Sequence, residues 1–216
     1  ELITADLHVH TCYSGDSNIR LEKLIDRCLE VGINCVSICD HNTITGALKL
    51  KDTAPFKVIV AEEIMTPDGE LMGLFLTKEV PKGLSPQETI ERVRRQGGLV
   101  GIPHPFGCSP LQKTRKLLSP EILSLIDFVE VFNARTPFSN STTKSWKLAI
   151  DHRLTASAGS DAHTIGEIGH AGVEMPDFTG SSDFLDSLYK GRVWGKRSSL
   201  SVHLASTWAK IHHILC

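Results

Sequence analysis

The sequence predicts an α/β fold in which parallel strands form a barrel wrapped by helices. Short apolar runs alternate with amphipathic segments of helical spacing, and the links between them are short. Histidines and acids follow at least five of the apolar runs. A barrel brings the carboxyl ends of all its strands to one rim, whereas an open sheet gathers only those near its switch point. The placement of these polar residues therefore favours the barrel.

Composition places the chain among ordinary globular proteins. Its 216 residues suit one domain, with 41% hydrophobic residues, 22% charged residues and a formal net charge of −2. Tight binding to a nucleic-acid backbone needs an excess of clustered cations, so we expect no stable binding to duplex nucleic acid. A small phosphorylated substrate or a nucleotide is compatible with this charge. The oligomeric state does not follow from the sequence.

The apolar runs and the cysteines indicate the compartment. No signal peptide is visible and no run approaches the length of a bilayer span, so we expect a cytoplasmic protein without membrane contact. The six cysteines are scattered, with no C-x-x-C pair: Cys12, Cys28, Cys35, Cys39, Cys108 and Cys216. In a chain with its own core, we expect free thiols in a reducing cytoplasm rather than a disulfide framework.

The first strand begins at Leu2 and ends where the histidines of Asp6-Leu7-His8-Val9-His10-Thr11 begin. Side chains two apart on a strand point the same way, so His8 and His10 face one volume. Two converging imidazoles provide the first two ligands of a transition-metal site. In isolation, an H-x-H pair is more often a hydrogen-bonded pair of histidines, so the metal-site interpretation depends on the later strand ends.

The remaining elements follow in order, each with a local reason. The first helix has apolar residues at helical spacing from Leu21 and ends at Gly32. A later helix starts at Ser85-Pro86, with Ser85 as the N-cap and Glu88 three residues on. The other predicted strands span residues 35–39, 56–61, 71–76 (hairpin-like), 99–102, 128–132 and 154–158, and the other helices span about 46–50, from 119, 140–151, 181–189 and 199–213.

Six clusters of candidate metal ligands lie just past predicted strands. They are His8/His10, Asp16, Asp40/His41, Glu62/Glu63, His104 and Asp161/His163. Satisfied polar residues are the ordinary explanation for any one cluster. Histidines and acids at so many strand ends, two pairs of them spaced two apart, favour a site for several metal ions.

These motifs, in this order, resemble the PHP (polymerase and histidinol phosphatase) metallophosphoesterases. The matching segments are D-L-H-V-H-T, the S-G-D loop, C-D-H-N, A-E-E-I, I-P-H-P and G-S-D-A-H, and the resemblance spans residues 4 to about 175. It implies a distorted seven-stranded (β/α) TIM-like barrel of PHP type, as one domain over residues 1–216. The helix at about 199–213 is expected to pack on the barrel. Two or three divalent ions are expected at the carboxyl-end rim.

The resemblance also implies a ligand set, residue by residue. His8, His10, Glu63 and Asp161 surround one ion and form the expected catalytic group. Glu63 bridges to a second ion that His104 also binds, and a third ion is held by Asp16, His41 and His163.

Three acidic positions leave alternatives open. Spacing does not choose between Glu62 and Glu63, because a strand buried on both faces lacks alternation; the family's G-x-E pattern, which falls on Ala61-Glu62-Glu63, selects Glu63. Asp40 is a supporting or alternative ligand beside His41. Glu130 is either a ligand or an orienting group.

One position departs from the family pattern in a way that matters. Many relatives have a histidine just before the L-x-G of the fourth strand, whereas Glu70 precedes Leu71-Met72-Gly73 here. Either Glu70 ligates in place of the histidine, or the second ion is weaker or absent.

The expected reaction is hydrolysis of a phosphomonoester, of a small molecule or of a nucleotide or oligonucleotide end. Clustered divalent ions supply a metal-bound hydroxide at neutral pH and neutralise phosphoryl charge. Mixed imidazole and carboxylate ligands suit zinc, manganese or iron. Arg135, with Asn133 beside it, is the expected phosphate contact, although a salt bridge is the ordinary role of a single arginine.

Two other functions compete with this prediction. A barrel amidohydrolase also opens with H-x-H and ends with an aspartate. That class normally uses a bridging lysine, however, and Glu63 stands in its place. The other alternative is a non-catalytic PHP module whose metals serve structure or regulation.

Overall fold

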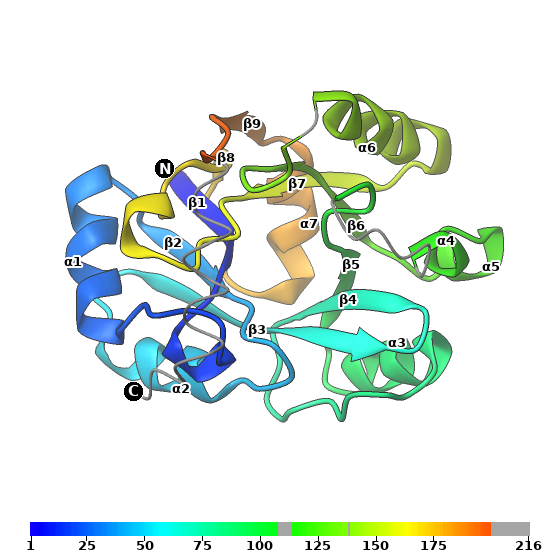
Figure 1. Cartoon of the computed structure of the whole chain (residues 1–216), viewed down its shortest axis with the longest axis horizontal. Helices are drawn as coiled ribbons and strands as arrows, with labels where there is room; N and C mark the ends of the chain where they lie inside the picture. The colour runs from blue at the N-terminus through cyan, green and yellow to red at the C-terminus, as the bar shows by residue number, and fades with distance from the viewer. Residues whose placement is uncertain (108–113, 138, 200–216) are drawn as a thin grey trace.

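The computed structural model describes residues 1–107, 114–137 and 139–199. Nine strands form one sheet in the order β7-β6-β5-β4-β3-β2-β1-β8-β9, with helices packed around it (Figure 1). The strands are β1 (Leu2–Val9), β2 (Cys35–Ile38), β3 (Lys57–Thr66), β4 (Gly69–Leu74), β5 (Leu99–Ile102), β6 (Phe128–Asn133), β7 (Thr155–Gly159), β8 (Ala171–Pro176) and β9 (Arg192–Gly195). The helices are α1 (Leu21–Val31), α2 (Thr45–Thr53), α3 (Pro86–Arg94), α4 (Thr114–Leu117), α5 (Pro120–Leu123), α6 (Ser139–His152) and α7 (Ser181–Tyr189), with 3-10 turns η1 (Cys12–Ser14) and η2 (Ile165–Glu167).

Strands β1 to β7 curl into a nearly closed barrel. The first and last of them meet at the rim, where Asp161 N donates to His8 O at 2.7 Å and His10 N donates to Ala162 O at 3.0 Å. Val9 and Ala162 form a parallel bridge at the same place. The predicted barrel is confirmed, and its seam between β1 and β7 runs through the segment that carries the histidines.

The predicted hairpin-like fourth strand is confirmed, and it interrupts the otherwise parallel barrel. β4 runs antiparallel to both β3 and β5, because a tight turn at Gly69 returns the chain directly beside β3. β8 and β9 extend the sheet beyond β1 as antiparallel strands that the sequence analysis does not predict. The barrel is therefore a mixed one, with β4 reversed.

Two apolar cores lie on opposite faces of the sheet. The outer core packs the barrel wall against the surrounding helices and includes Leu24 of α1 and Val93 of α3. The inner core fills the barrel with Ile3, Met175 and Phe184, among others. Phe184 belongs to α7, so this helix fills the barrel at the amino ends of the strands and leaves the opposite end to polar side chains.

An irregularity in β1 turns the histidines inward. The pairing of β1 with β2 shifts register between Asp6 and Val9. Leu7 packs in the inner core and Val9 in the outer core, with His8 and His10 fully buried beside them. Gly159 of β7 makes room for this segment, since a Cβ on Gly159 would lie 2.3 Å from the Cβ of His8.

Most predicted elements lie where the sequence places them, including the helix ends at Gly32 and Ser85. Gly32 takes the left-handed conformation (φ 75°) after α1, and the Ser85 hydroxyl accepts from Glu88 N before α3. The predicted third strand, 56–61 with its end at Glu62-Glu63, is too short, because pairing with β4 carries β3 on to Thr66. The helix predicted over 199–213 lies outside the described residues except for residue 199, and the single-domain assignment stays a prediction.

The cysteines are of two kinds. Cys28, Cys35 and Cys39 are free and buried, as predicted, and burial raises the pKa of each thiol to about 12. Cys12 is disulfide-bonded, so the expectation of a free thiol is wrong there. Cys108 and Cys216 lie outside the described residues. Within the described ranges, no helix is long and apolar enough to cross a bilayer.

Candidate metal centre

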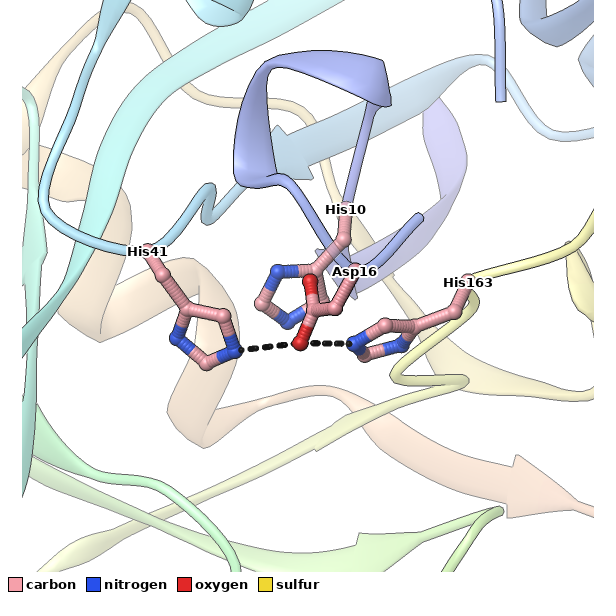
Figure 2. Close-up of side chains that lie close together, drawn as sticks. All are labelled: His10, Asp16, His41 and His163. Carbon is pink, nitrogen blue, oxygen red and sulfur yellow. Dashed lines mark ion pairs between the residues drawn. The ribbon is translucent and has the colours of Figure 1, made fainter. Parts of the chain in front are cut away.

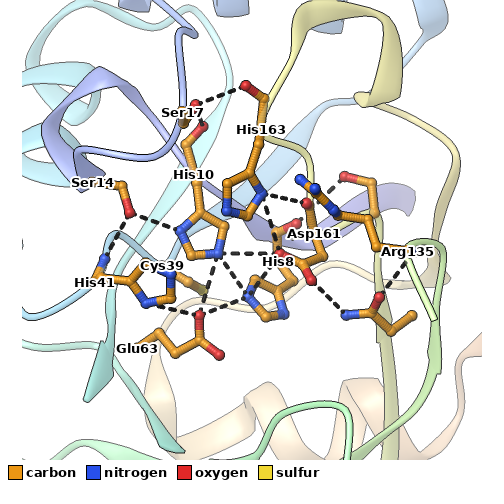
Figure 3. Close-up of polar contacts among 12 residues, drawn as sticks. His8, His10, Ser14, Ser17, Cys39, His41, Glu63, Arg135, Asp161 and His163 are labelled. Carbon is orange, nitrogen blue, oxygen red and sulfur yellow. Dashed lines mark hydrogen bonds and ion pairs between the residues drawn. The ribbon is translucent and has the colours of Figure 1, made fainter. Parts of the chain in front are cut away.

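The candidate ligands converge at the carboxyl-end rim of the barrel, opposite α7. His8 lies on β1 and His10 directly follows it, while Glu63 lies on β3. His104 lies in the segment after β5 and Asp161 in the segment after β7. Figure 3 shows the rings of His8, His10 and His41 arranged around Glu63. Residues separated by more than 150 positions thus share one polar volume.

Three of the imidazoles have one nitrogen held by the protein and the other turned into the centre. His8 Nδ1 donates to Glu130 Oε1 at 3.0 Å, and His163 Nδ1 donates to the Asp161 carbonyl at 2.8 Å. His10 Nδ1 lies 3.1 Å from the Ser14 hydroxyl. Each contact fixes the ring and leaves Nε2 facing inward, which is the arrangement typical of metal-ligating histidines.

The inward atoms of the first group have the separations that a metal ion requires. His8 Nε2 and His10 Nε2 lie only 3.0 Å apart. Glu63 Oε2 lies 3.5 and 3.3 Å from these two nitrogens, and Asp161 Oδ1 lies 3.7 and 3.3 Å from them. Ligands bound at about 2.1 Å to one ion are separated by about 3–3.5 Å in octahedral or tetrahedral geometry. These separations therefore fit one ion, which His8, His10, Glu63 and Asp161 would hold between them.

A second group is built around Asp16. Its Oδ2 lies 3.2 Å from His41 Nε2 and 3.4 Å from His163 Nε2, so the carboxylate sits between two rings (Figure 2). The ligand atoms of His10, Asp16, His41 and His163 all lie within 4.8 Å of one another. Asp16, His41 and His163 are the residues that the resemblance assigns to the third ion, and the structure adds His10 to them.

Glu63 connects the groups. Its Oε1 lies 2.9 Å from His104 Nε2, while its Oε2 lies 3.3 Å from His41 Nδ1. Further sets of ligand atoms within 4.8 Å of one another are His8, His104 and Asp161, and His41, Glu63 and Glu70. Glu63 is 1% exposed, so its carboxylate contacts these side chains and not solvent.

The acids of the centre are held as anions by the rings around them. Burial alone would raise the pKa of Asp16, but His163 and His41 outweigh burial and hold that pKa well below its ordinary value. Burial alone would lower the pKa of His104, yet its hydrogen bond and attraction to Glu63 raise the pKa to about 10. Because metal ligands bind in their deprotonated form, an ion that enters the centre displaces these protons.

Two predicted ligands have other roles in the structure. The Asp40 carboxylate accepts from the backbone N and the hydroxyl of Thr11, both at 2.6 Å, and belongs to none of the ligand groups. Glu130 accepts from His8 through one oxygen and from His104 N through the other at 2.8 Å. Of the two alternatives left open for Glu130, these contacts support the orienting role.

The residues expected to bind substrate lie in the wall of the centre. Asn133 Nδ2 donates to Glu130 Oε2 at 3.0 Å and to Asp161 Oδ2 at 3.2 Å, so the amide joins two acids of the site. Arg135 is 7% exposed, and its Nε lies 3.7 Å from Glu167 Oε1. Contact of Asn133 or Arg135 with a substrate stays a prediction.

Two candidate ligands sit on left-handed backbone. Asp161 has φ 54° and His104 has φ 26°, a conformation that costs a non-glycine residue free energy. Hydrogen bonds from the two backbone N–H groups offset this free energy: Asp161 N donates to His8 O, and His104 N donates to the Glu130 carboxylate. Such strain is typical of functional positions.

Sequence reasoning missed Ser14, which connects two ligands. Its hydroxyl contacts His10 Nδ1 and accepts from His41 N at 3.1 Å. The only sequence signal was its position in the polar loop directly after the first strand. A serine there is ordinary in any turn, so the role needs the structure.

Comparisons with known proteins agree with these motifs. A family model described as "PHP domain" matches residues 6–66, and one described as "PHP-associated" matches residues 140–193. The chain is 44% identical over 144 residues to the uncharacterized protein MJ1587 of Methanocaldococcus jannaschii, covering 60% of this chain and 81% of that protein. It is 37% identical over 194 residues to MJ0417 of the same organism, covering 85% and 78%.

Solved structures share the fold at low identity. A two-domain protein from Bacteroides vulgatus, described as containing a predicted PHP-like metal-dependent phosphoesterase, superposes with a TM-score of 0.71 at 14% identity. The match covers 91% of this chain and 65% of that one. An amidohydrolase from Chromobacterium violaceum gives a TM-score of 0.63 at 14% identity, covering 88% and 97%.

Proposed function

This chain belongs to the PHP family, and from that premise we propose that it is a metal-dependent phosphoesterase acting on phosphomonoesters. The observation that carries the proposal is the set of inward Nε2 atoms, which converge on Glu63 and Asp16, with the rings of His8 and His163 fixed by outer hydrogen bonds. A structural cluster of histidines would not require such consistent orientation.

The proposed ligands are His8, His10, Glu63, His104 and Asp161, together with the group around Asp16. When bound, divalent ions acidify water toward neutrality and neutralise the charge of a phosphoryl group. Glu130 and Ser14 hold the rings in place, and Asn133 holds Asp161 and Glu130 together. Zinc, manganese and iron all suit this mixture of donors.

The substrate that we propose is a small phosphorylated molecule or the phosphorylated end of a nucleotide or oligonucleotide. Arg135 lies at the same rim, where its planar guanidinium would pair with phosphate oxygens. Its ion pair with Glu167 keeps it beside the centre. The formal net charge of −2 supports a small substrate rather than a duplex.

The test is hydrolysis of a generic aryl phosphate by protein reconstituted separately with Zn²⁺, Mn²⁺ and Fe²⁺, followed by a panel of phosphorylated metabolites and short oligonucleotides. We expect metal-dependent phosphate release that a chelator abolishes. Glu63→Gln is expected to remove it. Glu62→Gln, one residue away on the opposite face of β3, is the matched control. Full metal occupancy without hydrolysis of any phosphate ester would favour the non-catalytic module instead.

The structural neighbour from Chromobacterium violaceum keeps the amidohydrolase alternative in the test. A panel of amides and lactams, assayed with the same metal-loaded protein, distinguishes the two reactions. We expect no turnover of these substrates, because Glu63 stands where that class normally uses a bridging lysine. Amide hydrolysis without phosphate release would replace the proposal.

A cytoplasmic location stays a prediction. The three free, buried thiols are compatible with it. The disulfide at Cys12 is unusual for a reducing compartment and argues for measuring the redox state of that cysteine in cells.

A further inference from the structure

Glu70 lies at the amino end of β4, at the mouth of the metal centre. The neighbouring parallel strands reach this rim with their carboxyl ends. β4 is reversed relative to β3 and β5, so it reaches the rim with its first residues. The reversal therefore places a residue from the start of a strand among residues from the ends of others.

The register of the hairpin sets the direction of the Glu70 side chain. In the ladder between β3 and β4, Glu63 pairs with Met72 and Met65 pairs with Glu70. Met72 packs in the inner core, and residues two apart on a strand share a face. Glu70 therefore faces inward on the same side as Glu63.

The ligand atoms confirm this direction. One carboxylate oxygen each from Glu63 and Glu70 and one ring nitrogen of His41 lie within 4.8 Å of one another. The Glu70 carboxylate makes no hydrogen bond and no ion pair with any residue that the structure describes. His41 Nδ1 is buried, makes no hydrogen bond with a described residue, and lies 3.3 Å from Glu63 Oε2. Two carboxylates therefore converge beside this ring nitrogen, which is the arrangement that a cation stabilises.

We propose that Glu70 is a ligand of a divalent ion that it shares with Glu63, and that its carboxylate makes this position prefer Mn²⁺ over Zn²⁺. Carboxylate oxygens suit harder ions such as Mn²⁺, whereas imidazole-rich sets suit Zn²⁺. The group around Asp16 contains three imidazoles and one carboxylate, so the two positions differ in donor chemistry. The inference rests on the metal centre proposed above and is independent of which ester the centre hydrolyses.

The experiment measures metal binding directly. Chelator-stripped protein is titrated with Mn²⁺ while free Mn²⁺ is followed by electron paramagnetic resonance, and bound metal is counted by elemental analysis after gel filtration. Glu70→Gln keeps the shape and removes the charge. We expect it to bind one Mn²⁺ fewer per chain at concentrations that saturate the wild type. Glu70→His should regain the ion but exchange it for Zn²⁺ in competition.

Asp68→Asn is the matched control. Asp68 lies in the same hairpin turn, but its carboxylate pairs with Lys116 at 2.9 Å and belongs to none of the ligand groups. This variant should keep the wild-type Mn²⁺ count. Melting curves in chelator, expected to coincide for all variants, separate loss of a ligand from loss of the fold.

The possible results test three claims separately: that Glu70 binds metal, that it favours Mn²⁺, and that the centre hydrolyses phosphate esters. Glu70→Gln with wild-type Mn²⁺ count and affinity overturns this inference, even if phosphate esters are hydrolysed normally. Glu70→His that still prefers Mn²⁺ overturns the selectivity. Wild-type protein that binds its ions yet hydrolyses no ester overturns the proposed function and leaves this inference standing.

Discussion

Glu62 and Glu63 are neighbours on β3, yet the protein shifts the pKa of the two carboxyls in opposite directions. Glu63 faces the inside of the barrel. Burial alone would raise its pKa, but four imidazoles outweigh burial and hold the pKa well below its ordinary value. Glu62 faces the outer wall, where one oxygen accepts from Val80 N at 2.9 Å and the other has no hydrogen bond with a described residue. Burial raises the pKa of Glu62 to about 7.

The difference shows that the face of the strand, not the residue type, assigns the role. Both side chains are at most 1% exposed, so burial alone does not distinguish them. On the inner face, cationic rings stabilise the anion. On the outer face, no cationic side chain of a described residue offsets burial, so the pKa of Glu62 rises despite the hydrogen bond from Val80 N. The Glu63 carboxyl therefore favours the anionic form that binds a cation, and the Glu62 carboxyl favours the neutral form.

The largest expected effect on activity comes from removing the negative charge of Glu63. Glu63→Gln takes away the carboxylate that contacts His8, His10, His41 and His104. We expect phosphoesterase activity to fall by at least about 100-fold and bound metal to decrease, because the loss affects more than one ion. Activity assays and elemental analysis check this. Wild-type metal content in Glu63→Gln would contradict the bridging role.

A somewhat smaller effect on metal affinity is expected for Glu130, which contacts the proposed ligand His8 and not the ion itself. Glu130→Gln keeps the shape that holds His8 but weakens its hydrogen bond with Nδ1. Orienting partners of this kind typically contribute 10- to 100-fold in metal affinity, so we expect a loss of about that size. Isothermal titration with the preferred metal measures it. A loss as large as that of Glu63→Gln would instead identify Glu130 as a ligand.

The outer carboxyl should affect stability rather than activity. Its folded pKa of about 7 lies above the ordinary 4.5, so the folded state holds the proton more tightly. Its contribution to stability is therefore fully present below pH 4.5 and is lost as the pH rises through 7. Glu62→Gln should remove this decline and stabilise the protein at pH 8 by about 1–2 kcal/mol, since a buried amide proton offsets part of the gain.

Chemical denaturation of both proteins from pH 4 to pH 9 tests this prediction. The relevant quantity is the difference in free energy of unfolding between Glu62→Gln and wild type at each pH. A difference that does not change with pH would show that Glu62 is ionised in the folded protein. Activity of the variant should stay within about two-fold of wild type.

The smallest effect is expected for an acid in full solvent. The Asp183 carboxylate accepts from Gly180 N and Thr179 N at the start of α7, and these bonds lower its pKa to about 2. Its contribution is present above the ordinary pKa of 3.8 and is lost as the pH falls toward 2. Asp183→Asn should lower the melting temperature slightly at pH 7 and not at all at pH 2. Equal losses at both pH values would contradict the charge-based account.

The sequence predicted the parts of this molecule that depend on local rules. Alternation on a strand predicted that His8 and His10 share a face, and Ser85 and Gly32 mark helix ends through their own backbone chemistry. The choice between Glu62 and Glu63 could not come from the strand itself, because both of its faces are buried. The family's G-x-E pattern made that choice, and the contacts of Glu63 with the histidine rings agree with it.

Other features depend on contacts between distant segments. The hairpin that reverses β4 was predictable from the sequence. That the reversal brings Glu70 to the rim of the barrel, beside Glu63, was not. The disulfide at Cys12 and the support that Ser14 gives to two rings have no local pattern. Substrate contacts at Arg135 stay a prediction because a buried ion pair with Glu167 accounts for its position.

The seam between β1 and β7 has a consequence for how the protein matures. His8 and His10 are synthesised before Asp161 and His163, which lie on the other side of the seam and follow some 150 residues later. A nascent chain therefore presents only half of the binding site while the residues between them are made. Completion of the barrel and capture of the full set of ions become a single late event.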